Sequence, residues 1–291
     1  MSRVAASAAG VPRPVVKWAG GKSKLAEQLV AWMPKQIDTY VEPFCGGGAV
    51  FFRLAGEKPR RYRRAVLADK NEHLIALYTA IQTRVDELIE NVGKLASHHL
   101  ALSRDAREKH YYEVRNRQPS PSDVVACGAR FLFLNKTCFN GLWRVNSSGK
   151  NNVPFGRYAT PKILDVDALR AANRALAGVK LKVADFAKVT EKLGKGDFVY
   201  FDPPYVPVSK TASFTSYAKD RFGPKEQERL RDLLHRLKKR GVGAMLSNAL
   251  TLETEELYRG FDWERVPMPR SINSDPGKRG EVEELVVRVA S

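Results

Sequence analysis

The chain has 291 residues, long enough for one large domain or a domain with an insert, and long enough to bury a substantial core. Its 49 Lys and Arg against 32 Asp and Glu give a net charge of +17, which suggests a polyanionic partner, most simply nucleic acid, while composition alone indicates a solvated basic surface equally well. The three cysteines and five histidines lack metal-ligand spacing, and no apolar run reaches the length of a membrane helix. The odd, low number of cysteines argues for a reducing compartment, so we expect a cytoplasmic protein. We also expect it to be a monomer in solution.

The first third of the chain alternates between helix and strand patterns. Residues 23–33 carry apolar side chains at helical spacing. Residues 39–44 predict a short buried strand, residues 45–56 a glycine turn that runs into a helix, and residues 65–69 a second strand. The basic run at 58–64 is interpreted as a solvated loop, with contact to DNA as the alternative.

The middle of the chain, residues 71–172, is mostly helical and polar in pattern. Inside it, residues 139–158 mix aromatic, basic and turn-forming side chains, which indicates a β-hairpin or loop that presents them outward. Strand patterns return in the last third, at 179–186, 197–205, 242–248 and 283–289, with a helix at 223–241.

Strands that alternate with helices indicate an α/β fold with a mostly parallel sheet, into which a helical region is inserted. We therefore expect a disordered tail at residues 1–13 and a sheet domain formed by residues 14–72 and 176–291. The inserted domain, mainly helical and carrying the hairpin, spans residues 73–175.

The stretch KWAGGKSKL at residues 17–25 contains Gly21-Lys22-Ser23, which resembles the end of a phosphate-binding loop. Val16 stands where such a loop needs its first glycine, and the two prolines in the preceding run make a poor central strand. A nucleoside triphosphatase is therefore rejected, and the glycine pair needs another explanation.

The stretch VEPFCGGGAVFF places three consecutive glycines, Gly46 to Gly48, between a strand and a helix. Asp69 ends the next strand, 21 residues after Gly48, where an acidic side chain can bind ribose hydroxyls. A dinucleotide fingerprint needs a third glycine further on, which is missing. The pattern fits a nucleoside cofactor without a pyrophosphate, such as S-adenosylmethionine, and the alternative is a packing turn.

The stretch VYFDPPY places Asp202, Pro203, Pro204 and Tyr205 at the carboxyl end of an apolar strand, where ligands of open α/β sheets bind. The prolines fix the turn, so that a carboxylate, the Pro203 carbonyl and an aromatic face form one rigid group. That group suits a planar base that carries an amino group. The alternative is an ordinary strand ended by prolines.

These motifs together resemble the amino-directed DNA methyltransferases, and specifically the Dam family of DNA adenine-N6 methyltransferases of the D12 class, in the α arrangement. The resemblance includes KWAGGK near the start, NGLWRVN and NVPFGRY in the middle, FDPPYVPVS and FTSY, and RSINS with EELVV at the end. It implies a Rossmann-like methyltransferase sheet as the catalytic domain and residues 73–175 as the target-recognition domain for double-stranded DNA.

The resemblance also implies roles for individual residues. Asp202, Pro203 and Tyr205 are the expected catalytic residues, and Trp18 and Lys22 are expected to hold the methionine end of S-adenosylmethionine, for which no metal is needed. The expected cofactor-binding residues are Trp18, Ala19, Gly20, Lys22, Glu42, Pro43, Phe44, Gly46, Gly48, Asp69, Asp185, Phe186 and Asp202. The expected DNA-binding residues are Lys17, Phe139, Asn140, Leu142, Arg144, Asn146, Pro154 and Arg157.

We expect methyl transfer to adenine N6 in GATC after the base is flipped out of the duplex. Arg144 can bond guanine O6 and N7 together, although contact with phosphate alone is the other interpretation. A cytosine-N4 enzyme would use the same architecture but tends to have Ser at position 202, and RNA or protein-glutamine enzymes tend to have Asn there. A DNA-binding homologue without catalysis is disfavoured by the intact Asp202, Tyr205 and glycines.

Overall fold

The computed structural model describes residues 10–205, 222–269 and 281–290, so most of the predicted tail and the FTSY and RSINS motifs lie outside the described residues. The chain forms two compact units, each made of three segments. Unit 1 consists of Met1–Ala31, Gly46–Arg60 and Asn71–Leu181, and unit 2 of Trp32–Cys45, Arg61–Lys70 and Lys182–Ser291. In the described part of the chain no helix is long and apolar enough to cross a bilayer.

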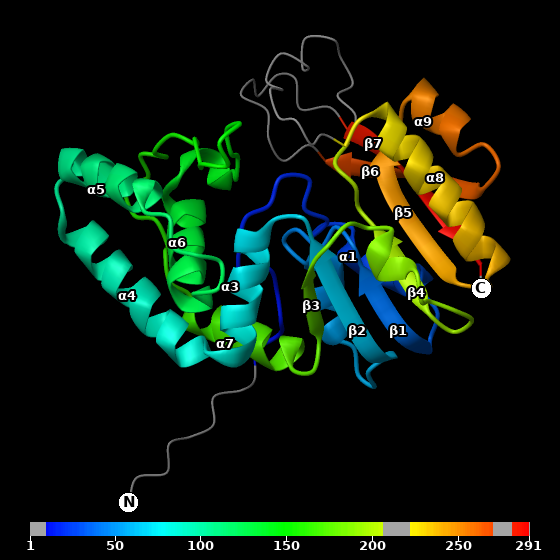
Figure 1. Cartoon of the computed structure of the whole chain (residues 1–291), viewed down its shortest axis with the longest axis horizontal. Helices are drawn as coiled ribbons and strands as arrows, with labels where there is room; N and C mark the ends of the chain where they lie inside the picture. The colour runs from blue at the N-terminus through cyan, green and yellow to red at the C-terminus, as the bar shows by residue number, and fades with distance from the viewer. Residues whose placement is uncertain (1–9, 206–221, 270–280, 291) are drawn as a thin grey trace, which may run out of the picture. The chain divides into compact units, whose positions relative to one another are not determined.

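Unit 2 is built on a seven-stranded sheet with the order β3-β2-β1-β4-β5-β7-β6, drawn as arrows in Figure 1. β1 pairs in parallel with β2 and β4, and β4 pairs in parallel with β5, whereas β7 is antiparallel to both β5 and β6. The strands are β1 (Ile37–Glu42), β2 (Tyr62–Asp69), β3 (Lys180–Val183), β4 (Phe198–Phe201), β5 (Gly243–Ala249), β6 (Asp262–Pro269) and β7 (Glu281–Val289).

The parallel strands at the centre of the sheet are apolar because both of their faces are covered. Every residue of β4 and β5 is buried, which accounts for the continuous apolar run of Phe198–Phe201. Helix α8 (Pro224–Lys239) packs against β5 through four buried leucines. It begins with Pro224 and Glu226 in its first turn and ends with basic residues, and these signals make its bounds readable from sequence.

The short elements of unit 2 are α9 (Leu252–Leu257), which Thr251 and Thr254 cap reciprocally, and the 3-10 turn η2 (Lys188–Thr190). Neither α9 nor β6 was expected from the sequence. The loop expected at residues 58–64 is wrong for Tyr62–Arg64, since these residues form the start of β2 and pair with β1.

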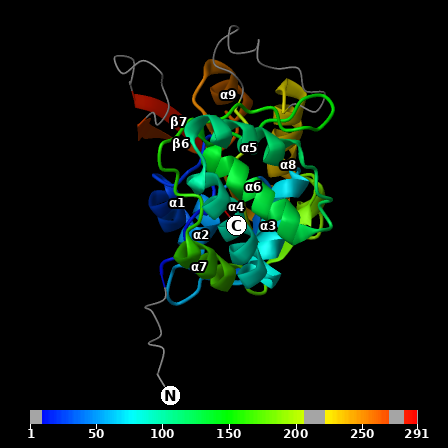
Figure 2. The ribbon, with the colours of Figure 1, turned by 90° about the vertical axis from the view of Figure 1, so that its left-hand side faces the viewer.

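Unit 1 is mainly helical, and Figure 2 looks onto its helices. The buried helix α6 packs against α3, α4 and α5. The helices are α1 (Ala26–Trp32, whose last residue falls in unit 2), α2 (Ala49–Ala55), α3 (Glu72–Thr83), α4 (Val85–Ala101), α5 (Arg104–Asn116), α6 (Val124–Thr137), the 3-10 turn η1 (Phe139–Gly141) and α7 (Val166–Leu176).

The structure confirms the α/β class, the mostly parallel sheet and the helical middle of the chain. The predicted hairpin at 139–158, here called the recognition loop, contains η1 and two isolated bridges, Cys138 to Phe155 and Val145 to Asn151, rather than named strands. The compact units do not follow the predicted domain bounds, since the first segment and the glycine turn belong with the helices. The functional division into catalytic and recognition domains stays a prediction.

Candidate active site

Three acidic residues lie at the carboxyl edge of the parallel sheet in unit 2. Glu42 ends β1, Asp69 ends the neighbouring β2, and Asp202 follows β4 on the other side of β1. Glu42 is 2% exposed and accepts a hydrogen bond from the Tyr40 hydroxyl at 2.8 Å, whereas Asp69 and Asp202 are partly exposed. Parallel pairing therefore brings together, at the edge where α/β proteins bind ligands, three residues that lie far apart in sequence.

The Asp202–Tyr205 tetrapeptide leaves the sheet directly after β4. Pro203 is buried and Pro204 is exposed. Burial, followed by the charges of Asp202 and Glu284, raises the pKa of the Tyr205 hydroxyl, which keeps the phenol neutral. The tetrapeptide thus presents one partly exposed carboxylate beside an uncharged aromatic side chain.

Asp185 follows β3 and lies within a cluster of charges. Arg229 of α8 donates to both of its carboxylate oxygens, and Lys70 Nζ lies 3.4 Å from Oδ2. Burial raises the pKa of the Asp185 carboxyl, but hydrogen bonds from Arg229 and from the Ala187 backbone outweigh burial and hold that pKa below its ordinary value. The carboxylate is therefore ionised and held in place.

The residues beside Asp185 form an aromatic cluster. The rings of Phe44 and Phe186 stack with their centroids 5.4 Å apart, and Phe222 meets Phe44 edge-on at 5.3 Å. The Arg229 guanidinium lies 4.4 Å from the centroid of the Phe186 ring. Two predicted cofactor residues, Phe44 and Phe186, are thus in contact, and Phe186 is itself fully covered.

In unit 1, Trp18 packs on the glycine turn. Gly46 has φ 44°, and a Cβ added there would lie 2.5 Å from the indole Nε1 of Trp18. The Tyr78 hydroxyl donates to the Gly46 carbonyl at 2.7 Å from below the turn. The predicted cofactor residues Trp18, Gly46 and Gly48 are therefore neighbours, and the glycine is needed because the indole fills the space a side chain would take.

Lys22 is almost fully buried, with 2% of its surface exposed, and its ammonium donates to the Gly20 carbonyl at 2.8 Å. Ala19 and Gly20 are exposed. The motif at residues 17–22, here called the amino-terminal motif, is thus a tight turn over a buried cation, which is a suitable partner for an anionic group.

The outer part of the recognition loop is closed by Asn146, whose Oδ1 accepts the backbone N–H groups of Ser148 and Lys150, both at 3.0 Å. Further in, Arg144 Nε donates to Asn152 Oδ1 at 2.7 Å, and the Asn152 N–H donates to the Arg144 carbonyl at 3.1 Å. Arg144 is exposed and supported by its own loop.

The base of the recognition loop gathers the other predicted DNA-binding residues. Phe139 is half exposed, and the Asn140 N–H donates to the Tyr158 hydroxyl at 3.0 Å. Lys17 extends its ammonium over the Tyr158 ring, 5.2 Å from the centroid. Leu142 is partly exposed, Pro154 and Arg157 are exposed, and Arg157 lies 3.9 Å from Glu108.

Several residues with clear structural roles in these sites were not predicted from the sequence. Tyr158 supports both Lys17 and Asn140, Asn152 holds Arg144, and Arg229 holds Asp185. The fourth is Asn135 of α6, whose buried amide contacts the backbone of Lys17 and Gly141. Asn152 lies only eight residues from Arg144, across the same loop, whereas Arg229 and Asn135 act through contacts with residues 44 and 118 positions away, for which sequence spacing carries no signal.

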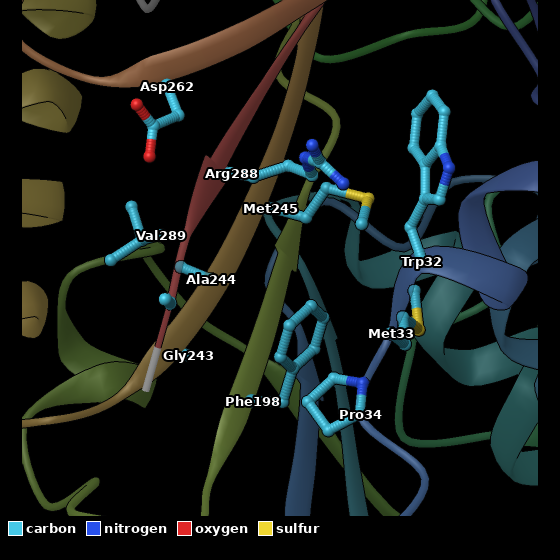
Figure 3. Close-up of a pocket in the computed structure, with 11 residues that line it drawn as sticks. Trp32, Met33, Pro34, Phe198, Gly243, Ala244, Met245, Asp262, Arg288 and Val289 are labelled. Carbon is cyan, nitrogen blue, oxygen red and sulfur yellow. The ribbon is translucent and has the colours of Figure 1, made fainter.

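A pocket of about 460 Å³ lies in unit 2 at the opposite, amino-terminal edge of β4 and β5 (Figure 3). Arg288 reaches over the ring of Trp32 there, 5.4 Å from its centroid, and also pairs with Glu264. The pocket is lined by Trp32, Met33, Pro34, Phe198, Gly243, Ala244, Met245, Asp262, Arg288, Val289 and Ala290. It includes none of the predicted site residues.

The family model of the D12 class N6 adenine-specific DNA methyltransferases matches residues 18–272. The chain is 41% identical to the type II methyltransferase M.MjaIII of Methanocaldococcus jannaschii, over 94% of this chain and 98% of that protein. It is 37% identical to the type II methyltransferase M1.LlaDCHI of Lactococcus lactis subsp. cremoris, over 94% of this chain and 94% of that protein. It is 36% identical to the DNA adenine methylase of Haemophilus influenzae, over 94% of this chain and 92% of that protein. The match extends through the amino-terminal motif, the recognition loop and the tetrapeptide, and the chain belongs to the D12 class of N6 adenine-specific DNA methyltransferases.

Proposed function

We propose that this enzyme transfers the methyl group of S-adenosylmethionine to N6 of adenine in duplex DNA, within GATC, after the adenine has been flipped out of the helix. The observation that carries the proposal is the Asp202–Tyr205 tetrapeptide at the carboxyl end of β4, on the sheet edge that also bears Glu42 and Asp69. A flipped base and a nucleoside cofactor both need polar groups at such an edge.

The residues of each unit fit parts of S-adenosylmethionine by their chemistry. In unit 2 the partly exposed Asp69 offers carboxylate oxygens to ribose hydroxyls, and Asp185 with Phe186 suits the adenine of the cofactor. In unit 1 the Lys22 ammonium suits the carboxylate of the methionine part, next to Trp18. The proposed cofactor-binding residues also include Ala19, Gly20 and Gly48 of unit 1, and Pro43 and Phe44 of unit 2.

Asp202 and Pro203 are proposed to act on the amino group of the target adenine. That nitrogen is a weak nucleophile because its lone pair is conjugated with the ring. If the Asp202 carboxylate and the Pro203 carbonyl accept its two N–H bonds, a pyramidal nitrogen is favoured and its lone pair is freed. Tyr205 would stack on the flipped ring and fix its orientation.

The cofactor supplies an electrophilic methyl group bound to a sulfonium. The methyl group would pass to N6 with S-adenosylhomocysteine as the leaving group, and the amino group would release one proton. The chain contributes position and a fixed negative charge beside the nitrogen on which positive charge develops.

The recognition loop is proposed to read the target in the major groove. Arg144 can donate to O6 and N7 of one guanine, and Pro154 can contact a thymine methyl. The residues proposed to hold the site beside the flipped base are Phe139, Asn140 and Leu142. Further contacts with DNA are proposed for Lys17, Asn146 and Arg157. The net charge of +17 provides the attraction to the phosphate backbone.

The test is transfer of a radiolabelled methyl group from S-adenosylmethionine to duplexes with and without GATC, followed by hydrolysis to nucleosides. We expect label in N6-methyladenine, and protection of GATC from an endonuclease that cuts only unmethylated sites. Label in cytosine would establish the N4 enzyme instead, and no label with retained binding would establish a homologue without catalysis. Label in adenine outside GATC would refute the target sequence alone.

A further inference from the structure

Asn135 uses every hydrogen-bonding group of its side chain to join the amino-terminal motif to the recognition loop. Its Oδ1 accepts the Lys17 N–H at 2.8 Å, and its Nδ2 donates to the Lys17 carbonyl and to the Gly141 carbonyl, both at 2.9 Å. The residue is 1% exposed, near the end of α6. The amide therefore pairs with Lys17 as a neighbouring strand would, and holds the loop at the same time.

Lys17 packs so closely against Gly141 that no side chain fits at position 141. Gly141 has φ 67°, and a Cβ added there would lie 2.6 Å from the Cβ of Lys17. The next residue along the chain, Trp18, fills the space above Gly46. A shift of the backbone at Lys17 therefore moves the residue that packs on the glycine turn and presses on the recognition loop at the same time.

A chain of stacked rings follows the same route. Trp18 stacks with Phe131 of α6 at a centroid distance of 6.4 Å, and Phe131 stacks with Trp143 of the recognition loop at 4.1 Å. The ring contacts fix the distance between the two segments, and the Asn135 amide fixes their register, because hydrogen bonds are directional and ring contacts are less so.

We propose that Asn135 is a positioning residue that couples the cofactor-binding segment to the target-reading segment, so that occupancy of the amino-terminal motif and discrimination of the DNA sequence depend on one buried amide. The inference rests on the proposed function of these two segments. It predicts that the affinity for cofactor and the affinity for the correct duplex rise together, and that this dependence is lost when the amide is altered.

The test compares Asn135→Asp with Asn173→Asp. Asn173 is the matched control because its Nδ2 also donates to two backbone carbonyls of unit 1, those of Ile81 at 2.7 Å and Gln82 at 3.1 Å, away from either segment. In N135D the carboxylate keeps the acceptor for the Lys17 N–H but turns an oxygen toward two carbonyl oxygens. Binding of S-adenosylhomocysteine is measured by calorimetry, with and without target duplex.

In the wild type and in N173D we expect the target duplex to tighten cofactor binding, and in N135D we expect that factor to fall to about one. We also expect N135D to lose about tenfold in the ratio of kcat/KM between the target and a duplex with one base changed, and to regain part of it as the pH is lowered, since a protonated carboxyl can donate again. A purely structural defect would lower activity on both duplexes alike, without this pH dependence.

The wild-type methylation pattern tests the proposed function, and the comparison of variants tests the coupling on whatever target the wild type prefers. Thermal unfolding checks each variant, and if N135D does not fold, Asn135→Ser, which keeps one donor and one acceptor, is measured in its place. Unchanged coupling in a folded Asn135 variant, or equal losses in the Asn135 and Asn173 variants, would overturn the proposal.

Discussion

The Arg144 guanidinium is held by Asn152 across the recognition loop, through a 2.7 Å hydrogen bond from Nε to Oδ1 and a second, longer one from Nη2 to the Asn152 carbonyl. An exposed arginine normally samples many rotamers, and fixing it in advance reduces the entropy lost when it binds. The other guanidinium nitrogen, Nη1, takes no part in this pairing and, with Nη2, can face a base edge.

Substituting Arg144 should therefore change sequence preference at one base pair. We expect Arg144→Ala to lose about 1–3 kcal/mol of discrimination at a single guanine, and to leave the salt dependence of binding nearly unchanged. Competition binding with duplexes changed at each position of the target measures this. Arg170→Ala is the control, since Arg170 pairs with Asp86 on the helical surface. A uniform loss on every duplex would make Arg144 a phosphate contact.

Asn152→Ala should weaken binding of the target duplex in the same direction as Arg144→Ala but to a smaller extent, because it removes the support and leaves the arginine in place. The double variant should lose no more than Arg144→Ala alone, as expected for two residues that act as one unit. Additive losses in the double-mutant cycle would show that Asn152 acts on the DNA independently.

Removing the carboxylate at Asp202 should greatly reduce turnover while leaving the fold intact. We expect Asp202→Ala to reduce kcat by roughly 10²–10³-fold or more, comparable to the loss of one preorganised electrostatic contact to a reacting atom. Single-turnover methyl transfer measures it, with Asp232→Ala, at an exposed position of α8, as the control. Near wild-type turnover in a folded Asp202→Ala protein would remove the residue from the mechanism.

Asp69→Ala should weaken cofactor binding more than DNA binding. Loss of a hydrogen bond from a charged group costs about 1.5–3 kcal/mol, so the Kd for S-adenosylmethionine should rise about 10- to 100-fold in a calorimetric titration. Asp38→Ala is the matched control, because Asp38 is near the opposite end of the neighbouring strand and pairs with Arg63. Equal cofactor affinities in the two variants would show that Asp69 has only a structural role.

The stability of unit 1 should fall at acid pH because His99 is buried as a neutral base. Burial, with the positive charges of His110, Arg107 and His98, lowers its pKa to about 4, and its Nδ1 lies 3.2 Å from the Nδ1 of His110. The unfolded chain binds the proton first, so stability is lost as the pH falls from about 6.5 toward 4, by at most about 3 kcal/mol.

His99→Phe preserves a ring against Phe133 and removes the proton-binding group. Urea unfolding at a series of pH values should therefore show a smaller loss of stability between pH 7 and pH 4 in the variant than in the wild type. Parallel pH profiles for the two proteins would contradict the assignment.

The sequence predicted elements best where local chemistry decides them. Helix α8 was predicted from Pro224 at its start and from its leucines at helical spacing. Strand β4 was predicted from an apolar run that ends shortly before two prolines. The sheet edge followed from the strands, because parallel ends meet at one side, and this placed Asp69 and Asp202 correctly at strand ends. Glu42, which the sequence predicted inside a strand over residues 39–44, is instead the last residue of β1.

What the sequence did not reveal depends on contacts between distant residues. Strand β6 pairs with β7 through cross-strand neighbours that are not adjacent in the chain, and its charged, proline-containing sequence lacks the usual strand pattern. The close approach of Trp18 to Gly46, which leaves no room for a side chain there, joins two residues 28 positions apart in sequence. Asn135 likewise looks like an ordinary helix-end residue until its partners are known.

The chain passes between the two units after residues 31, 45, 60, 70 and 181, and this interleaving limits which segments relatives can exchange by recombination. Two crossovers can transplant residues 71–181 as one block, with the helices and the recognition loop, but they leave Lys17 behind with the recipient. The partners of Asn135 at that position are main-chain groups, which any residue except proline supplies. The hydrogen bonds at this one junction therefore need no matched substitution at position 17 when residues 71–181 are exchanged between relatives.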